Sequence, residues 1–264
     1  MNFFELFEST KPIIGVVHLK PLPGAPLYDN FNDVLEWAVK DAKNLEDGGV
    51  DGVIVENYND NPFKIRVTEP ETIAAMSVVA HEVKKELSIP VGISFLRNSA
   101  IEALGIAFVT NLEFIRVNVF VESVVTDSGL INAIAPELIR YRKKLSANIG
   151  VFADVNVKHA APIGNRQIED IILDAFERGC ADAVIITGRR TGKPPDIKVL
   201  IATRAVASGA ILIGSGLNMK NLDLLSNADG AIVGTYFHKE GNISKPVDKK
   251  RVELLMSKVK RMYG

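Results

Sequence analysis

The 264-residue sequence has one cysteine, Cys180, and no excess of either charge sign. A single cysteine excludes an internal disulfide framework and is typical of a protein in the reducing cytoplasm. Lysine and arginine together number 31 and the acidic residues 32, so the net charge is -1. The sequence also has no Lys/Arg-rich run of the kind that follows a phosphate backbone. We therefore expect a cytoplasmic protein with no nucleic-acid partner.

Long hydrophobic runs are missing as well. No apolar stretch approaches the length of a membrane-spanning helix, and "MNFFELFES" (1–9) is acidic where a secretory signal peptide needs basic residues. The sequence therefore predicts no integral membrane segment. The Lys/Arg cluster in "DKKRVELLMSKVKRMYG" (248–264) is typical of the solvated face of an amphipathic helix, with a membrane-surface patch as the alternative.

Short β-branched segments recur along the chain, and each is followed by a helical pattern such as 31–49 or 70–87. Eight strands alternating with helices over about 250 residues is the size and order of a (β/α)₈ TIM barrel, an α/β fold. A doubly wound open sheet is the runner-up, but no dinucleotide fingerprint opens the first helix. No linker divides the chain, so we expect residues 1–264 to form one barrel domain. The predicted strands are 13–19, 51–57, 90–96, 113–119, 150–157, 181–187, 210–214 and 229–234.

The segment "VFADVNVKHAAP" (151–162), on the fifth predicted strand, alternates strictly between apolar and polar residues. In a barrel one face of a strand meets the helices and the other faces the interior, with its last residues at the C-terminal mouth. We expect Val151, Ala153, Val155 and Val157 to face helices and the polar residues between them to face the mouth. Polar residues also lie on the inward face of other predicted strands, among them Arg116. For each of these residues a structural role is the alternative to catalysis, such as an ion pair of Arg116 with Glu56 or Asp154. The candidate catalytic residues are Asp154, Lys158, Glu56, Asn118, His18 and Asn156.

The last two predicted strands end in "IGSGLN" (213–218) and "IVGTYF" (232–237). Glycines let backbone N–H groups approach an anion closely, and glycine-rich loops after strands seven and eight form the phosphate site of many barrels. Tight turns without a ligand are the alternative. The sequence predicts a phosphate-binding site after strands 7 and 8, made by Gly214, Ser215, Gly216, Gly234 and Thr235.

A basic, glycine-rich segment, "TGRRTGKPPD" (187–196), follows the sixth strand. It lacks the spacing of a Walker phosphate loop. It is either an exposed flexible loop or a lid that closes over an anionic substrate. The predicted lid residues are Thr187, Gly188, Arg189, Arg190, Thr191 and Gly192.

Several long segments resemble the BtpA family of (β/α)₈-barrel proteins along nearly the whole chain. They include "IGVVHLKPLPGAPLY" (14–28), "GGVDGVIVENYNDNPF" (48–63), "VFADVNVKHAAP" (151–162) and "VIITGRRTG" (184–192). The resemblance implies the barrel fold. The family's founding members are linked to photosystem I biogenesis at a membrane surface, and other relatives are described as nucleosidase-like or sugar-related enzymes. Family members often have histidine where this chain has Asn156, which puts in doubt any role that needs an imidazole there.

Two functions of different classes follow. The first is an enzyme that acts on a phosphorylated sugar or nucleoside: Asp154 or Glu56 is a general base, and Lys158 stabilises an oxyanion or forms a Schiff base. Asn118 and Asn156 orient hydroxyls, and His18 or His159 carries a proton. Isomerase, lyase and nucleosidase chemistry all stay open, and we predict no cofactor and no metal, although Glu56 with Asp154 is the alternative metal site. The second function is a non-catalytic assembly factor of the photosystem I type, peripheral to a membrane complex. The partners expected are a small phosphorylated ligand and, at this size, a second copy of the chain in a homo-oligomer.

Overall fold

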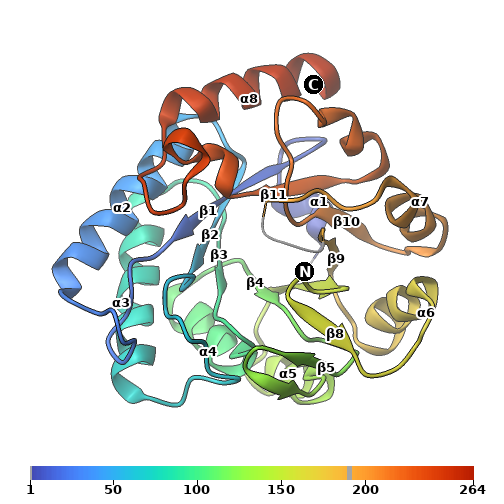
Figure 1. Ribbon diagram of the computed structural model, residues 1–264, viewed down its shortest axis with the longest axis horizontal. Coiled ribbons are helices and arrows are strands. Elements are labelled where there is room, and N and C mark those ends of the chain that lie inside the picture. Colours follow the sequence, from blue (N-terminus) through green and yellow to red (C-terminus); the bar gives the residue numbers. More distant parts are fainter. Residues whose placement is uncertain (1, 189–191) are drawn as a thin grey trace.

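A computed structural model describes residues 2–188 and 192–264. Within them, eight parallel strands close into a barrel in the order β1-β11-β10-β9-β7-β4-β3-β2. Figure 1 shows the helices as a ring around these strands. The first strand pairs in parallel with the last, so the doubly wound open sheet is excluded and the predicted barrel is confirmed. The barrel strands are β1 (Ile13–His18), β2 (Gly52–Glu56), β3 (Val91–Ser94), β4 (Phe114–Val117), β7 (Gly150–Val155), β9 (Ala183–Ile186), β10 (Ala210–Ile213) and β11 (Gly230–Val233).

Three of the long helices that surround the barrel begin at a side chain that satisfies a free backbone N–H group. The side chains of Asn30, Asp196 and Asp248 each accept a hydrogen bond from the amide two residues later, which caps α2, α7 and α8. The α-helices are α1 (Phe3–Leu6), α2 (Phe31–Asp47), α3 (Pro70–Glu86), α4 (Ala100–Thr110), α5 (Ala135–Lys144), α6 (Ile168–Leu173), α7 (Ile197–Val206) and α8 (Lys249–Tyr263). A π-helical turn, η1 (Asp174–Arg178), follows α6, and 3₁₀ turns occur at η2 (Leu222–Asn227), η3 (Thr235–Phe237) and η4 (Lys239–Gly241).

The barrel interior is a separate apolar cluster beneath the mouth. Phe114 and Phe152 stack there with ring centroids 4.6 Å apart. The short helix α1 closes the base of the barrel, because Phe3 packs on Phe152 and Phe7 packs on Phe114. Gly92 makes room for this stack, since a Cβ atom there would lie 2.3 Å from the Phe114 ring. The amino-terminal segment therefore fills the barrel, which its sequence did not indicate.

The alternation on β7 holds to the end of the strand and no further. Val151, Ala153 and Val155 belong to the outer core beneath the helices, while Phe152 lies in the interior cluster. The chain leaves the strand after Val155. The backbone at Asn156 is left-handed (φ 58°) and its side chain is exposed, so the prediction that Asn156 faces the interior is wrong.

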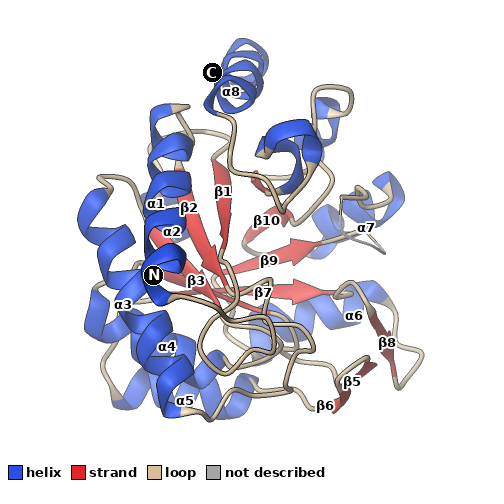
Figure 2. Ribbon diagram, turned by 60° about the vertical axis from the view of Figure 1, so that its left-hand side comes forward, coloured by secondary structure: helices blue, strands red, loops and turns tan. Residues whose placement is uncertain are grey.

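A small antiparallel sheet lies beside the barrel, formed by β5 (Val124–Thr126), β6 (Gly129–Ile131) and β8 (Ala160–Pro162) (Figure 2). Its strands come from the loops after β4 and β7. Val157 packs with Val124 and Ile131 of this sheet, so the prediction that Val157 faces helices is also wrong. The sheet holds the segment after β7 in place, and that segment carries Lys158.

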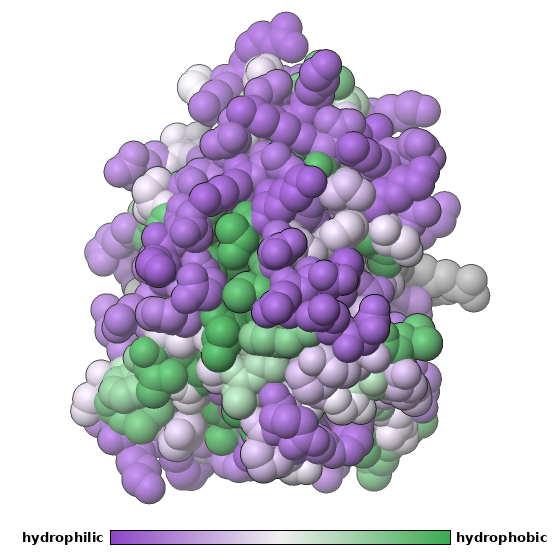
Figure 3. Space-filling view, turned by 90° about the vertical axis from the view of Figure 1, so that its left-hand side faces the viewer, coloured by the Kyte–Doolittle hydropathy of each residue, from purple (hydrophilic) through white to green (hydrophobic). Residues whose placement is uncertain are grey.

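The outer surface is mainly polar. Figure 3 views the face toward α2 and α3, where hydrophilic side chains cover most of the area and hydrophobic ones gather in the middle and lower part. Among the described residues, no helix combines the length and the hydropathy needed to cross a bilayer.

A buried carboxyl on α2 makes stability depend on pH. Asp41 is fully buried: its Oδ1 accepts a hydrogen bond from the Val247 amide, and within the described chain its Oδ2 has no partner. Burial raises the pKa of Asp41 to about 6. Because this folded-state pKa lies above the ordinary value of 3.8, the contribution of Asp41 to stability is full below pH 3.8 and is lost as the pH rises through about 6.

We expect Asp41→Asn to raise the thermal unfolding midpoint at pH 8 by roughly 5 °C, equivalent to about 2 kcal/mol. The gain should shrink below pH 5, where the native carboxyl is protonated. Differential scanning calorimetry from pH 4 to pH 8 measures this difference in unfolding midpoint between the variant and the native protein. Glu36→Gln on the exposed side of α2 is the control. A gain that does not change with pH would contradict this account.

Candidate functional site

Polar side chains line the mouth because inward positions alternate along each strand. Above the interior residues Ile54, Phe114 and Phe152, the next inward positions are Glu56, Arg116 and Asp154. His18 lies opposite Glu56 in the β1–β2 ladder. All four of these polar residues are at least 95% buried, so each has to find a partner in the protein or in a ligand.

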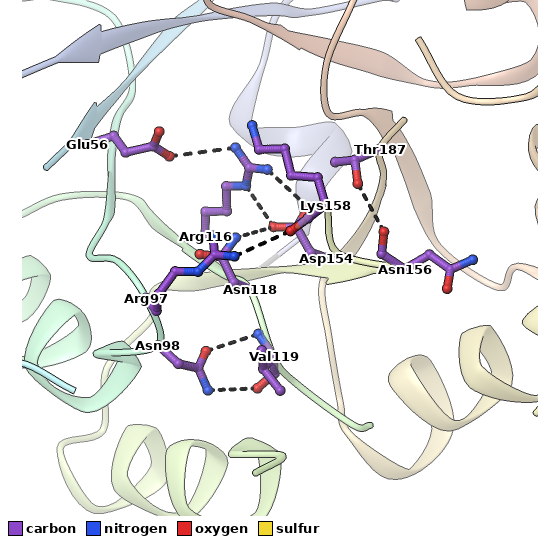
Figure 4. Close-up of polar contacts among 10 residues, drawn as sticks. All are labelled: Glu56, Arg97, Asn98, Arg116, Asn118, Val119, Asp154, Asn156, Lys158 and Thr187. Atoms are coloured by element: carbon purple, nitrogen blue, oxygen red, sulfur yellow. Dashed lines mark hydrogen bonds and ion pairs between the residues drawn. The ribbon is translucent and has the colours of Figure 1, made fainter. Parts of the chain in front are cut away.

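An ion-pair network connects three of the strands. Arg116 binds Asp154 through two hydrogen bonds, Nε to Oδ2 at 2.8 Å and Nη2 to Oδ1 at 3.0 Å. The Asn118 amide donates to the same carboxylate at 2.8 Å, and the Glu56 carboxylate lies 3.7 Å from Arg116 Nη1. Figure 4 shows these side chains pointing toward one another. Both Asp154 oxygens are therefore occupied. Within the described residues, Glu56 has a single long ion pair, with Arg116, and is the more available carboxylate.

This pairing also bears on the alternative metal site. Glu56 and Asp154 both face Arg116, whose guanidinium stands where a cation would bind. In the described part of the chain, no group of three or more His, Cys, Asp or Glu side chains is placed to hold a metal ion.

A cavity of about 180 Å³ adjoins the network, and Lys158 is one of the cations that line it. Figure 4 shows the Lys158 amine extending toward Arg116 and Glu56 while the Asn156 side chain points away. Burial and the nearby positive charge of Arg116 lower the pKa of Lys158, and Glu56 opposes this shift. Among the described residues, no carboxylate lies within 4.0 Å of its Nζ atom. The cavity is lined by Glu56, Tyr58, Asn61, Phe63, Leu96, Arg97, Arg116, Asn118, Asp127, Lys158 and His159.

Arg97 is a further cation that lines this cavity. It is buried, and it was not among the predicted site residues. Its Nη2 atom lies 3.4 Å from the carbonyl oxygens of Lys158 and His159 and 3.7 Å from the exposed carboxylate of Asp127. Its neighbour Asn98 fixes the loop by exchanging two hydrogen bonds of 3.0 Å with the Val119 backbone. The only sequence signal for Arg97 was its place directly after the third strand.

His18 lies between this cavity and a second one. Its ring contacts Tyr58 of the first cavity edge to face, with centroids 5.1 Å apart. On its other side it packs on Gly234, where a Cβ atom would lie 2.7 Å from the imidazole Cε1. His18 Nδ1 is 2.9 Å from Nε2 of His238, which no sequence pattern had indicated.

The second cavity, of about 390 Å³, lies at the loops after β10 and β11. Three of the five predicted phosphate residues line it: Gly216, Gly234 and Thr235. Gly214 instead packs on the side chains of Ile185 and Thr187, which fill the position of its missing Cβ. Further lining residues are Gly192, Leu217, Asn218, Met219, Lys220, Tyr236, Gly241 and Arg251.

Ser215, the other predicted phosphate residue, holds the loop after β9 instead of lining the cavity. Its hydroxyl accepts a hydrogen bond from the Gly188 amide at 3.3 Å and donates to the Lys193 carbonyl at 2.9 Å. Thr187 donates to the Asn156 carbonyl at 3.1 Å. The predicted lid residues Arg189, Arg190 and Thr191 lie outside the described residues, so the lid stays a prediction.

Removing the charge of Asp154 should destabilise the fold. In Asp154→Asn, Arg116 stays buried with only Glu56 at 3.7 Å to oppose its charge. Breaking a buried pair in this way costs about 3 kcal/mol or more. Urea denaturation measures the loss, with Asp29→Asn at an exposed position as the control. Equal stability of the two variants would contradict the central role of the ion pair.

Comparison with known proteins places the chain in a family. The family model described as "BtpA family" matches residues 9–261. An uncharacterized protein of Pyrococcus furiosus is 46% identical over 98% of this chain and 99% of its own length. The "Photosystem I biogenesis protein BtpA" of a Synechocystis species is 42% identical over 96% of this chain and 89% of its own length.

Solved structures share the fold at low sequence identity. N-(5'-phosphoribosyl)anthranilate isomerase from Pyrococcus furiosus superposes with a TM-score of 0.60 at 15% identity, over 95% of this chain and 99% of that one. GGGPS from Thermoplasma volcanium superposes with a TM-score of 0.62 at 13% identity over the whole of both chains. The similarity to these solved structures shows the barrel fold. The family model and the sequence relatives show that the chain belongs to the BtpA family.

Proposed function

We propose that this protein is an enzyme that acts on a phosphorylated sugar or nucleoside at the mouth of its barrel. The observation that carries the proposal is the half-buried Lys158, whose amine shares a cavity with Glu56 and has no ion-pair partner among the described residues. An amine held this way costs free energy in a purely structural role. Amines in such surroundings are common among residues that bind or react with a substrate.

The second cavity is the proposed phosphate site. Gly216, Gly234 and Thr235 line it together with the cationic side chains of Lys220 and Arg251. Backbone amides at glycines and a nearby cation are what phosphate recognition needs. The structural relatives named for phosphoribosylanthranilate isomerase and thiamine phosphate pyrophosphorylase have the same fold, which supports the proposal by analogy alone.

The residues proposed to carry out the reaction line the first cavity. The lowered pKa of Lys158 increases the fraction of neutral amine near neutral pH, and that form can attack a carbonyl carbon or take up a proton. Glu56 is the available general base, and Asn118 lines the same cavity. The choice among isomerase, lyase and nucleosidase reactions is left to experiment.

The phosphate site is tested by ligand-dependent stabilisation. We expect millimolar inorganic phosphate and ribose 5-phosphate to raise the thermal unfolding midpoint in a saturable way, because they bind only the folded chain. Lys220→Gln should weaken this effect several-fold, and Lys85→Gln on α3 should not. No stabilisation of the native protein by either compound would overturn the phosphate site.

The reactive residue is tested by turnover. A screen of phosphorylated pentoses, hexoses and nucleosides should yield a substrate whose turnover falls roughly 100-fold or more in Lys158→Met or Glu56→Gln. Stabilisation by phosphate should persist in both variants. Because the neutral amine is the active form, the rate should rise with pH through the Lys158 pKa, which lies below its ordinary value. Full activity in Lys158→Met would remove Lys158 from the mechanism.

A non-catalytic role in assembly is the second candidate, and the 42% identity to the Synechocystis biogenesis protein favours it. The two functions differ in what they require of the cavity. An assembly factor should tolerate Lys158→Met in a complementation assay, whereas an enzyme whose product is needed should not.

A further inference from the structure

Two buried histidines form a hydrogen-bonded chain that ends on a backbone carbonyl. His238 Nδ1 lies 2.6 Å from the carbonyl oxygen of Lys245, and His238 Nε2 lies 2.9 Å from Nδ1 of His18. A carbonyl oxygen has no proton to give, so His238 must donate from Nδ1. In a neutral ring the Nε2 atom then has no proton and can only accept. His18 must therefore donate from Nδ1, which leaves its own Nε2 as an acceptor.

Both rings are held neutral by their surroundings. His238 is fully buried and His18 is 95% buried, and burial lowers the pKa of each. The cations Lys158 and Arg116 and the ring of His238 face His18 and lower its pKa further. Glu56, opposite His18 on β2, and the phenol ring of Tyr58 are the other ionisable groups beside it. The chain of bonds therefore fixes a single tautomer, with the proton on Nδ1, which is the less favoured nitrogen in water.

The fold makes room for this arrangement. His18 is the last residue of β1 and points inward, on the same face as Ile14 and Val16. Its Nε2 lies 3.2 Å from the place where a Cβ atom of residue 234 would stand, so any side chain larger than glycine would cover it. Gly234 thus leaves Nε2 uncovered by any side chain at position 234, which lines the second cavity.

We propose that His238 is a positioning residue, which holds His18 with Nε2 free to accept a hydrogen bond from a hydroxyl group of the ligand. The inference rests on the proposed function and narrows the substrate class to compounds with a hydroxyl group near the phosphate, as in a sugar phosphate. The acceptor stands between the predicted phosphate site and the Lys158 cavity. We expect a ligand that spans the two cavities to lie beside His18, because its ring contacts Tyr58 of the first cavity and Gly234 of the second.

The tautomer is measured directly by long-range ¹H–¹⁵N correlation spectra of the full chain with labelled histidine. We expect the Nδ1–H form for both His18 and His238 from pH 6 to pH 8. His238→Gln keeps an acceptor toward His18 Nδ1 and should keep that tautomer, whereas His238→Leu should shift His18 toward the Nε2–H form. Protonation of His18 at Nε2 in the native protein would overturn the inference. If His238→Leu does not fold, the native spectrum and the His238→Gln spectrum decide.

Ligand binding gives a second readout. Ribose 5-phosphate should bind the native protein more tightly than inorganic phosphate does, and His238→Leu should reduce that preference about 10-fold while leaving inorganic phosphate unchanged. Equal affinity of the native protein for the two compounds would contradict the role of His18. If neither compound binds, the proposed function fails, while the tautomer measurement still tests the histidine chain.

Discussion

The mouth of this barrel depends on the buried pair of Arg116 and Asp154. A guanidinium that is 96% buried requires a carboxylate in contact with it, and the two hydrogen bonds to Asp154 satisfy that requirement. The pair fixes the orientation of both strands' last inward side chains. It also determines which groups stay available to a ligand, because both Asp154 oxygens accept hydrogen bonds from the protein, while Glu56 and Lys158 line the cavity.

The two halves of the mouth differ in the size of their inward residues. On β1, β2, β4 and β7 the last inward side chains are polar, and they are His18, Glu56, Arg116 and Asp154. After β10 and β11 the corresponding positions are Gly214 and Gly234, and neighbouring side chains lean into the vacated space. His18 is one of these neighbours. Gly214 and Gly234 thus make room for neighbouring side chains, and of these two glycines Gly234 also lines the second cavity.

The barrel could be predicted from the sequence because parallel strands buried on both faces leave a strong signal of β-branched runs between amphipathic helices. Glu56, Arg116 and Asp154 could be placed at the mouth because they continue the inward alternation of their strands. Asn156 and Val157 could not, because the period of two has no meaning once the strand ends at Val155. His238 and the packing of Phe3 and Phe7 in the barrel base depend on contacts between distant parts of the chain, which no local pattern encodes.

The central claim is that the mouth binds one phosphorylated ligand across its two cavities. A crystal structure of the protein grown with ribose 5-phosphate tests it most directly. The account predicts density for the phosphate against Gly216, Gly234 and Thr235, with the sugar passing His18 toward Lys158. Density at any other place on the barrel, with both cavities holding only water, would contradict it.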